Sequence, residues 1–451
     1  MKNNIWIAMS SIIVGSLLIP SEAGSVLLPQ EKWVARYNGP DNGLDSANAV
    51  AVDNLGNVYV TGWSQGSGGV DNMDYATVKY NINGNQLWAK RYNGPANGVD
   101  DAKAIAVDGL GNVYVTGSSL GSGTNLDYST IKYGPKGKQL WAIRYNGPAN
   151  GNDKARAIAV DGSGNVYVTG ERGGTSPNRS DYATIKYNTN GKQLWVRRYN
   201  GPADLDFDSA WSIAVDDSGN VYVSGASYSW GTYYDYVTIK YSTKGKPLWE
   251  KRYVAQAGFP DKVSLAVDGS GNVYVTGESV GSIGFRDYAT IKYSTNGEEL
   301  WVKRYNGPAN GNDKARAIAV DGSGNVYITG FSKGLVGTGS DYATVKYSPN
   351  GEQLWAILYN GPLWGDDVAE AIAVDGSGNV YITGRSMSYG SDYATIKYST
   401  NGEQVWVKRY VGPYGQGSWA KAIVVDNNGN VYVTGESAGL GTGCDYATIK
   451  Y

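Results

Sequence analysis

The chain has 451 residues, with 63 glycines, 37 tyrosines and 14 tryptophans, but only 4 phenylalanines and no histidine. The formal net charge of −2 provides no global field for nucleic acid or an anionic membrane, so no nucleic-acid partner is expected. Without histidine there is no Ser-His-Asp triad, Cys-His pair or histidine-based metal site, and a single Cys444 excludes an internal disulfide.

Residues 1–23 have the features of a signal peptide: a positive charge at Lys2, a mostly apolar run over residues 5–19 and small residues around Ala23. Residues 24–32 are then a short leader segment. The apolar run is short for a membrane span, and no later segment is long and apolar enough to be one. We therefore expect an exported protein that is extracellular, at the cell surface or periplasmic. An uncleaved N-terminal anchor is the alternative.

Three motifs recur eight times over residues 33–451, at intervals of 51–55 residues. They are typified by NGEQLWVKRYNGP, VDGSGNVYVTG and DYATIKY. The tryptophans of the first are Trp33, Trp88, Trp141, Trp195, Trp249, Trp301, Trp355 and Trp406. The leading aspartates of the second are Asp53, Asp108, Asp161, Asp216, Asp268, Asp321, Asp375 and Asp426.

Each repeat predicts four strands, KARAIAVD, NVYVTG, DYATIKY and LWVKRY, all short and rich in β-branched or aromatic residues. The turns D-G-S-G-N and S-T-N-G supply glycine and asparagine where the backbone needs positive φ. Four antiparallel strands in about 50 residues are typical of a propeller blade. Since no linker divides the units, the sequence predicts one all-β, eight-bladed β-propeller over residues 33–451 rather than two four-bladed rings.

The order of motifs at the two ends predicts how the ring closes. The first predicted strand, around Trp33, is of the fourth type, and the chain stops at Tyr451 after a strand of the third type. The N-terminal strand is therefore expected to pair with the C-terminal blade, which removes the open sheet edges.

The consensus segments KYSTNGEQLWVKRYNG and AIAVDGSGNVYVTG resemble the SBBP bacterial propeller repeat, over nearly all of residues 33–451. The resemblance implies a propeller of exported or cell-surface bacterial type and no defined activity. The spacing of Gly191 and Trp195 also resembles, more weakly, the repeats of eight-bladed quinoprotein dehydrogenases. The adjacent-cysteine pair of many such enzymes cannot exist in a chain with one cysteine.

In a propeller, the turns inside the first and third strand pairs lie on one face and all other connections on the opposite face. The first set is nearly identical between copies, whereas the second varies, as in SQGSGGVDNM, ERGGTSPNRS and ASYSWGTYY. Binding residues commonly lie on loops held by a rigid scaffold, so the variable set is predicted to form the working surface.

Aromatic residues outside the repeat positions gather in or beside these variable connections. Such side chains suit sugar stacking or a protein interface, or they simply fill gaps between loops. The predicted ligand-binding residues are Trp63, Trp211, Trp230, Tyr233, Tyr234, Trp364, Tyr414 and Trp419.

A second pattern consists of six aspartates, each eight residues before a turn aspartate. Asp261 is displaced by one residue from this slot, and Ser418 takes the last one. A ring of carboxylates could bind Ca²⁺, a hard cation that prefers oxygen ligands. The alternative is that each carboxylate accepts hydrogen bonds from backbone amides where its strand begins. The six are Asp45, Asp100, Asp153, Asp208, Asp313 and Asp367.

Together these patterns predict an exported, non-catalytic and monomeric scaffold that binds a glycan or a protein partner through its variable face. Two hypotheses from other classes remain. One is a carbohydrate-active enzyme that uses two carboxylates, the chemistry that survives without histidine. The other is a purely structural cell-surface or adhesion element.

Overall fold

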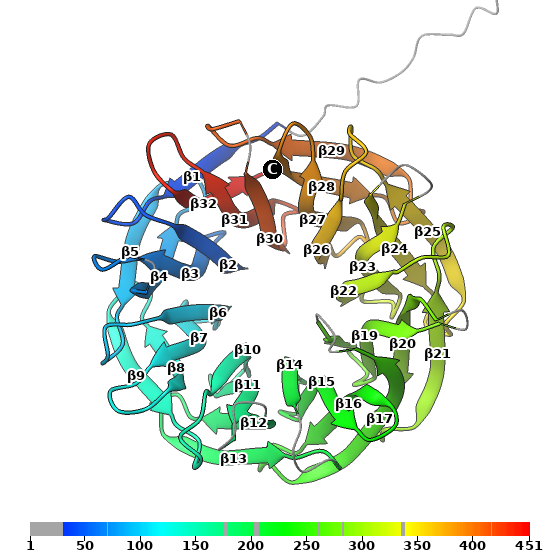
Figure 1. Ribbon diagram of the computed structural model, residues 1–451, viewed down its shortest axis with the longest axis horizontal. Coiled ribbons are helices and arrows are strands. Elements are labelled where there is room, and N and C mark those ends of the chain that lie inside the picture. The colour runs from blue at the N-terminus through cyan, green and yellow to red at the C-terminus, as the bar shows by residue number, and fades with distance from the viewer. Residues whose placement is uncertain are drawn as a thin grey trace, which may run out of the picture.

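The computed structural model describes residues 30–69, 71–174, 179–202, 207–258, 262–281, 284–334, 339–415 and 417–451. In these residues, thirty-two strands form eight four-stranded antiparallel sheets, arranged as blades around one axis (Figure 1). The predicted eight-bladed propeller is confirmed. The predicted signal peptide and Asp261 lie outside the described residues. No helix of the described part has the length and apolar character needed to cross a membrane.

The first strand of each blade lies nearest the axis and the fourth at the rim (Figure 1). The first strands are β2 (Asp45–Val52), β6 (Asp100–Val107), β10 (Lys154–Val160), β14 (Asp208–Val215), β18 (Ser264–Val267), β22 (Lys314–Val320), β26 (Val368–Val374) and β30 (Ser418–Val425). The second strands are β3 (Val58–Gln65), β7 (Val113–Leu120), β11 (Val166–Gly173), β15 (Val221–Ser229), β19 (Val273–Val280), β23 (Val326–Lys333), β27 (Val380–Met387) and β31 (Val431–Ala438).

The third strands are β4 (Met73–Tyr80), β8 (Leu126–Tyr133), β12 (Ser180–Tyr187), β16 (Tyr233–Tyr241), β20 (Arg286–Tyr293), β24 (Ser340–Tyr347), β28 (Ser391–Tyr398) and β32 (Cys444–Lys450). The fourth strands are β5 (Gln86–Tyr92), β9 (Gln139–Tyr145), β13 (Gln193–Tyr199), β17 (Pro247–Ala257), β21 (Glu299–Tyr305), β25 (Gln353–Tyr359), β29 (Gln404–Tyr410) and β1 (Trp33–Tyr37). Blade 1 is β2–β5, blades 2 to 7 follow in chain order, and blade 8 is β30–β32 with β1.

Closure occurs in blade 8, where β1 pairs antiparallel with β32 from Trp33 opposite Lys450 to Tyr37 opposite Tyr446. Figure 1 shows the blue β1 beside the red β32. The predicted pairing of the N-terminal strand with the C-terminal blade is confirmed. It leaves no blade with an unpaired third strand, which is the edge that would otherwise invite association.

The core lies between blades because the two faces of each sheet carry side chains of different size. Tyr59 and Tyr75 of blade 1 pack against Ala102, Val115 and Ile131 of blade 2, and all five are fully buried. Equivalent clusters occur around the ring. The predicted packing of large aromatic faces on small aliphatic faces is confirmed, and each tyrosine buries on the order of 150–250 Å².

A pair of hydrogen bonds joins neighbouring blades at seven of the eight junctions in the described residues. Trp88 Nε1 and Lys79 Nζ of blade 1 both donate to the backbone carbonyl of Pro135 in blade 2, over 3.2 and 3.3 Å. The tryptophan bond recurs at seven junctions in the described residues. Between blades 7 and 8 the equivalent Trp406 instead packs on Tyr451, since no turn joins the third and fourth strands of blade 8.

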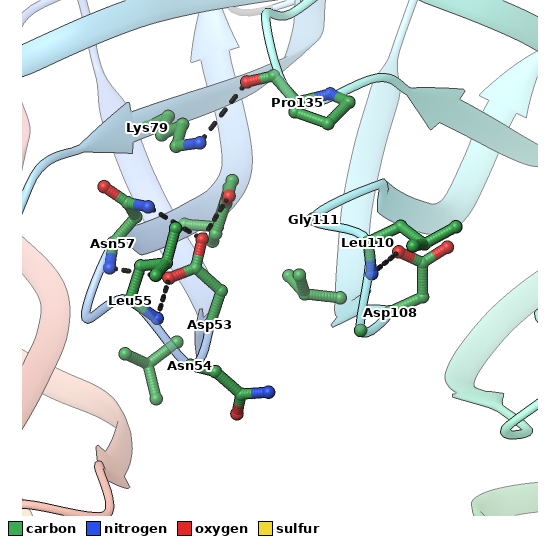
Figure 2. A pocket seen from close by; sticks show the side chains of 13 residues that line it. Asp53, Asn54, Leu55, Asn57, Lys79, Asp108, Leu110, Gly111 and Pro135 are labelled. Atoms are coloured by element: carbon green, nitrogen blue, oxygen red, sulfur yellow. Dashed lines mark hydrogen bonds between the residues drawn. The ribbon is translucent and has the colours of Figure 1, made fainter.

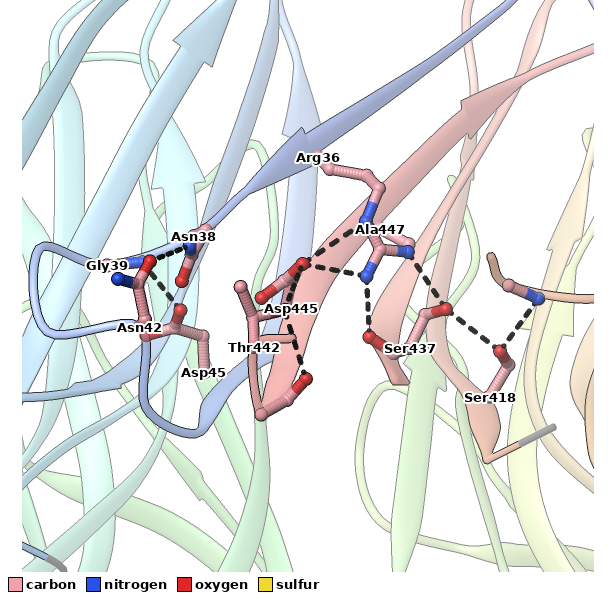
Figure 3. A network of polar contacts seen from close by, with 12 residues as sticks. Arg36, Asn38, Gly39, Asn42, Asp45, Ser418, Ser437, Thr442, Asp445 and Ala447 are labelled. Atoms are coloured by element: carbon pink, nitrogen blue, oxygen red, sulfur yellow. Dashed lines mark hydrogen bonds and ion pairs between the residues drawn. The ribbon is translucent and has the colours of Figure 1, made fainter. Parts of the chain in front are cut away.

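A charged bridge holds the base of the connection between the second and third strands. In blade 8, the Arg36 guanidinium lies 2.8 Å from the Asp445 carboxylate and donates to Ser437 (Figure 3). Arg91 forms the same bridge with Asp74 and Ser64 in blade 1. These contacts fix the ends of connections that differ in sequence from blade to blade. Loops of different sequence are therefore held at their ends by the same kind of contact.

Candidate functional site

The ring presents two faces of different character. The turns between first and second strands and between third and fourth strands lie together, as Asp53 and Pro135 do in one cleft; we call this the repetitive face. The connections between second and third strands and between blades form the other end, which we call the variable face. This is the division that the sequence predicted.

The eight predicted aromatic residues do not form one site. Trp230, Tyr233 and Tyr234 belong to the hairpin between β15 and β16. Trp364 and Tyr414 lie in the connections between β25 and β26 and between β29 and β30. The remaining three, Trp63, Trp211 and Trp419, lie within strands β3, β14 and β30.

The hairpin of blade 4 has the densest group of exposed aromatic side chains. Trp230 is 75% exposed and Tyr233 63% exposed, although both are large and mostly apolar. The Tyr228 ring lies 6.1 Å from Trp230 and 5.4 Å from Tyr234, both edge to face. A compact aromatic surface therefore stands at the tip of this hairpin.

The backbone of the same hairpin is strained at Tyr233, whose φ is 60°. A bulky residue in the left-handed region is an outlier, and such strain concentrates at binding and catalytic sites. Thr232 Oγ1 donates to the Asp235 carboxylate over 2.9 Å, and Arg252 pairs with that carboxylate at 3.0 Å. These bonds hold the base of the hairpin while its tip stays exposed.

Further exposed aromatic side chains lie on the variable face of other blades. Trp364 is 79% exposed and Tyr414 57% exposed. Tyr389, between β27 and β28, is 94% exposed. Burying such surface is favourable, so each one is a candidate contact for a bound partner.

The three aromatic residues inside strands have contacts of a different kind. The Trp211 ring lies 4.0 Å from the guanidinium carbon of Arg156, which belongs to blade 3. Trp419 of blade 8 lies between Arg385 of blade 7 and Lys421, at 5.2 and 5.5 Å. These are cation–π contacts, two of them between neighbouring blades. Trp63 pairs with Ser46 and Tyr75 in the sheet and is partly buried.

The six slot aspartates are buried, at 0–2% exposure, and each belongs to a different blade. Asp45 accepts a hydrogen bond from the backbone N–H of Gly39 over 2.6 Å (Figure 3). The equivalent bonds from Gly94, Gly147, Gly201, Gly307 and Gly361 measure 2.5–2.6 Å. Ser418 fills the slot of blade 8 and accepts from Gly412 N–H over 3.2 Å. The interpretation that these carboxylates accept from backbone amides is confirmed.

Burial raises the pKa of these carboxyl groups, to about 6 for Asp153 and Asp208. The structure does not bring them together as a metal site. Over the residues described, no group of three or more Cys, Asp or Glu side chains is placed to hold a metal ion. Each carboxylate instead accepts a hydrogen bond from a backbone N–H and so fixes the segment at which its blade begins.

Clefts between blades open on the repetitive face, which the sequence interpretation did not select. One of about 230 Å³ lies between blades 1 and 2 and is lined by Asp53, Asn57, Lys79, Leu110 and Pro135 (Figure 2). Similar clefts of about 390 and 410 Å³ lie between blades 4 and 5 and between blades 5 and 6. A lysine that recurs in all eight DYATIKY motifs, on a sheet face otherwise buried, was the available sequence signal.

A fourth cleft, of about 250 Å³, lies on the variable face and is lined by Asn152, Lys154, Glu171, Arg179 and Phe207 among others. Burial would raise the pKa of Glu171, but the opposing charges of Arg156 and Lys154 hold it below its usual value. None of the eight predicted aromatic residues lines any of these four clefts. The exposed aromatic side chains, which we call the aromatic platforms, therefore lie on open surface rather than in the wall of a pocket.

Comparison with known proteins shows the family of the chain and a curated relative. The family model described as Beta-propeller repeat, SBBP, matches residues 32–69, 87–123, 143–171, 252–284, 300–335, 359–390 and 405–441, together more than half of the chain. An uncharacterized WD repeat-containing protein of Acanthamoeba polyphaga mimivirus is 26% identical over 455 residues. That match covers 79% of this chain and 31% of the viral protein, so the chain spans about a third of that relative.

Solved structures that are similar to the chain share little sequence with it. A protein of unknown function from Bacteroides caccae matches with a TM-score of 0.36 and 13% identity, over 68% of this chain and 97% of its own. The β-propeller domain of the Trilobed protease from Pyrococcus furiosus has a TM-score of 0.43 and 12% identity, over 77% and 94%. Likeness at this level carries no functional argument.

Proposed function

Because the chain belongs to the family of the SBBP β-propeller repeat, we propose that it is an exported, non-catalytic propeller whose variable face binds a glycan. The observation that carries the proposal is the hairpin of blade 4. It exposes Trp230 and Tyr233 and holds Tyr233 in a strained backbone conformation. Backbone strain and exposed apolar surface both concentrate at binding sites, so their combination here supports a binding role for the exposed rings.

The arrangement of the platforms favours an extended ligand. Small molecules are bound in concave pockets, whereas Trp230, Trp364, Tyr389 and Tyr414 are open to solvent and belong to different blades and connections. A polymer can contact several such platforms at once, and simultaneous contacts multiply weak affinities. Aromatic rings stack on the C–H faces of sugars without needing a fixed charge. The features of residues 1–23 support export.

Binding of the mature protein to a glycan array tests the proposal. We expect binding to a polysaccharide class without turnover, with the Trp230→Ala/Trp364→Ala variant losing most of it. Leu440→Ala is a matched control because Leu440 is 70% exposed in the β31–β32 connection but not aromatic. It should bind as the wild type does.

Other outcomes have defined meanings. Capture of a protein, with no glycan bound and the same dependence on Trp230, would replace the glycan by a protein partner. Hydrolysis of a bound glycan that an Asp→Asn change on the variable face abolishes would overturn the non-catalytic assignment. Recovery of an exported chain that still carries residues 1–23 would favour the uncleaved anchor.

A further inference from the structure

Three clefts between blades on the repetitive face are built from the same repeat positions. Each of the three is lined by a turn aspartate, by the tyrosine six residues after it and by the lysine of the third strand. The next blade adds its own D-G-S-G-N turn and one residue of its turn between third and fourth strands, which is Pro135, Thr295 or Pro349. A ligand that fits one cleft would therefore find several of them on this face. A cleft between blades 8 and 1 is lined by turn residues without the tyrosine and the lysine.

The lysine of each cleft has hydrogen-bonding capacity that the protein does not use. Lys79, Lys240 and Lys292 are only 6–7% exposed. Each ammonium donates to one carbonyl of the next blade, over 2.9–3.3 Å, and lies 4.8–5.0 Å from a tyrosine ring centroid. An ammonium has three N–H donors, and the described residues supply no second acceptor to any of these three.

The position of that ammonium makes it available to a ligand. Figure 2 shows the Lys79 amino group directed across the cleft toward Pro135, with the two D-G-S-G-N-type turns on either side. Each lysine lines a cleft that is wide enough for water, so its remaining N–H groups can donate to water or to a ligand oxygen. Burial lowers the pKa of each lysine. A ligand oxygen that enters the cleft would replace water as the acceptor.

The turn carboxylates limit the charge of that ligand. Asp53 accepts from the backbone N–H groups of Leu55 and Asn57, from Asn57 Nδ2 and from the Tyr59 hydroxyl. These bonds hold its pKa below the usual value, so it stays ionised and has little capacity left for a metal. With Asp108 on the other side, the cleft has two negative charges for one positive charge, which disfavours an anion.

We propose that the clefts between blades bind neutral sugar residues, with lysine donating to a hydroxyl oxygen. A hydroxyl supplies an acceptor without negative charge, and volumes of about 230–410 Å³ are of the size of one sugar ring. The repetitive face then holds several equivalent, weak saccharide sites. They are separate from the aromatic platforms, so this proposal stands or falls independently of the proposed function.

Gly269 lines both the cleft between blades 4 and 5 and that between blades 5 and 6, so a large side chain at this position can enter either one. A Cβ at Gly269 would meet no atom within 4 Å, and its φ lies outside the left-handed region. The fold should therefore accept Gly269→Trp, and the indole would obstruct one of the two clefts. Leu194→Trp, on the half-exposed edge of β13, adds the same side chain away from the clefts and is the matched control.

Equilibrium dialysis with radiolabelled glucose, galactose, mannose and N-acetylglucosamine gives the number of sugars bound per chain. We expect more than one equivalent at millimolar concentration, one fewer in Gly269→Trp and no change in Leu194→Trp. The Lys240→Met/Lys292→Met variant leaves the clefts open and should weaken binding there by about tenfold, which keeps the test independent of steric effects.

Three results would overturn the proposal. They are no binding of any of the four sugars, a stoichiometry unchanged by both variants, and tighter binding of glucuronate than of glucose. The melting temperature of each variant, close to that of the wild type, establishes that lost binding does not reflect lost folding.

Discussion

A single residue at the start of each of six blades combines burial with an ionisable group. Asp208 is 2% exposed and accepts a hydrogen bond from Gly201, yet burial raises its pKa to about 6. The folded protein therefore holds this proton more tightly than the unfolded chain does. Stability from protonation is fully present below about pH 4 and is lost as the pH rises through about 6.

Replacement of Asp208 by Asn should remove this pH dependence while keeping an oxygen acceptor for Gly201. Relative to the wild type, Asp208→Asn should gain stability between pH 4 and 7, by about 1.4 kcal/mol for each unit of pKa shift removed. Urea unfolding at both pH values measures the difference. Asp217→Asn, at an exposed aspartate of the same blade, controls for loss of one charge. Parallel pH profiles for Asp208→Asn and the wild type would contradict the assignment.

The charged bridge gives a second test because blade 6 lacks it. Leu358 occupies the position that Arg91 has in blade 1, and burial raises the pKa of the adjacent Asp341, with no arginine beside it. Arg91→Leu should lower the free energy of unfolding by about 2 kcal/mol, since Asp74 and Ser64 lose a charged donor. Leu358→Arg should raise the melting temperature. Chemical denaturation of both variants checks this, and stabilisation by Arg91→Leu would refute the bridge.

Among structural elements, the hairpin between β15 and β16 combines an exposed aromatic surface with a strained backbone at Tyr233, which lowers the stability of the protein. A left-handed conformation costs a bulky residue about 1 kcal/mol, whereas asparagine tolerates it. Tyr233→Asn should therefore stabilise the protein by about 0.5–1 kcal/mol and weaken glycan binding, because a stacking ring is lost. Thermal unfolding and the glycan assay measure the two effects. A destabilised Tyr233→Asn with undiminished binding would contradict the role given to this hairpin.

Sequence patterns predicted the strands well but not every contact at their ends. The alternation in DYATIKY was sufficient to place Tyr75 on one side and Ala76 on the other. The sequence placed Trp211 in or beside the variable connections, and the structure places it in β14, at a register shift between Ala210 and Ser212. Its partner Arg156 lies 55 residues earlier, in another blade. Such a contact depends on the geometry between blades, which local patterns do not contain.

The whole ring depends on one pair of strands from opposite ends of the chain. Deletion of residues 31–40 removes β1 and exposes the edge of β32, so we expect a large drop in melting temperature and association through that edge. Calorimetry and size-exclusion chromatography measure both. A chain that lacks only residues 1–23 is the control and should melt as the full chain does. Unchanged melting after deletion of 31–40 would refute closure by β1.

At the scale of the molecule, the repeats made the fold predictable, but they did not show which residues come together in the clefts between blades. Eight copies of three motifs were enough to predict blade number and closure. They did not reveal that Lys79 of one blade lines the same cleft as Asp108 of the next, because the residues that form a cleft come from different repeats. The prediction of function from the sequence has the same limit. The sequence indicated which face varies, but only the structure distinguishes exposed Trp230 from the partly buried Trp419.

Hydroxyl-radical footprinting with and without a glycan from the array tests the central claim, binding at the variable face, most directly. The glycan is used at a concentration too low to occupy the clefts of the repetitive face. Oxidation of Trp230 and Trp364 should fall in the complex, while that of Trp88, a repeat tryptophan bonded to Pro135, stays the same. Unchanged oxidation of Trp230 and Trp364 in a saturated complex would contradict the claim.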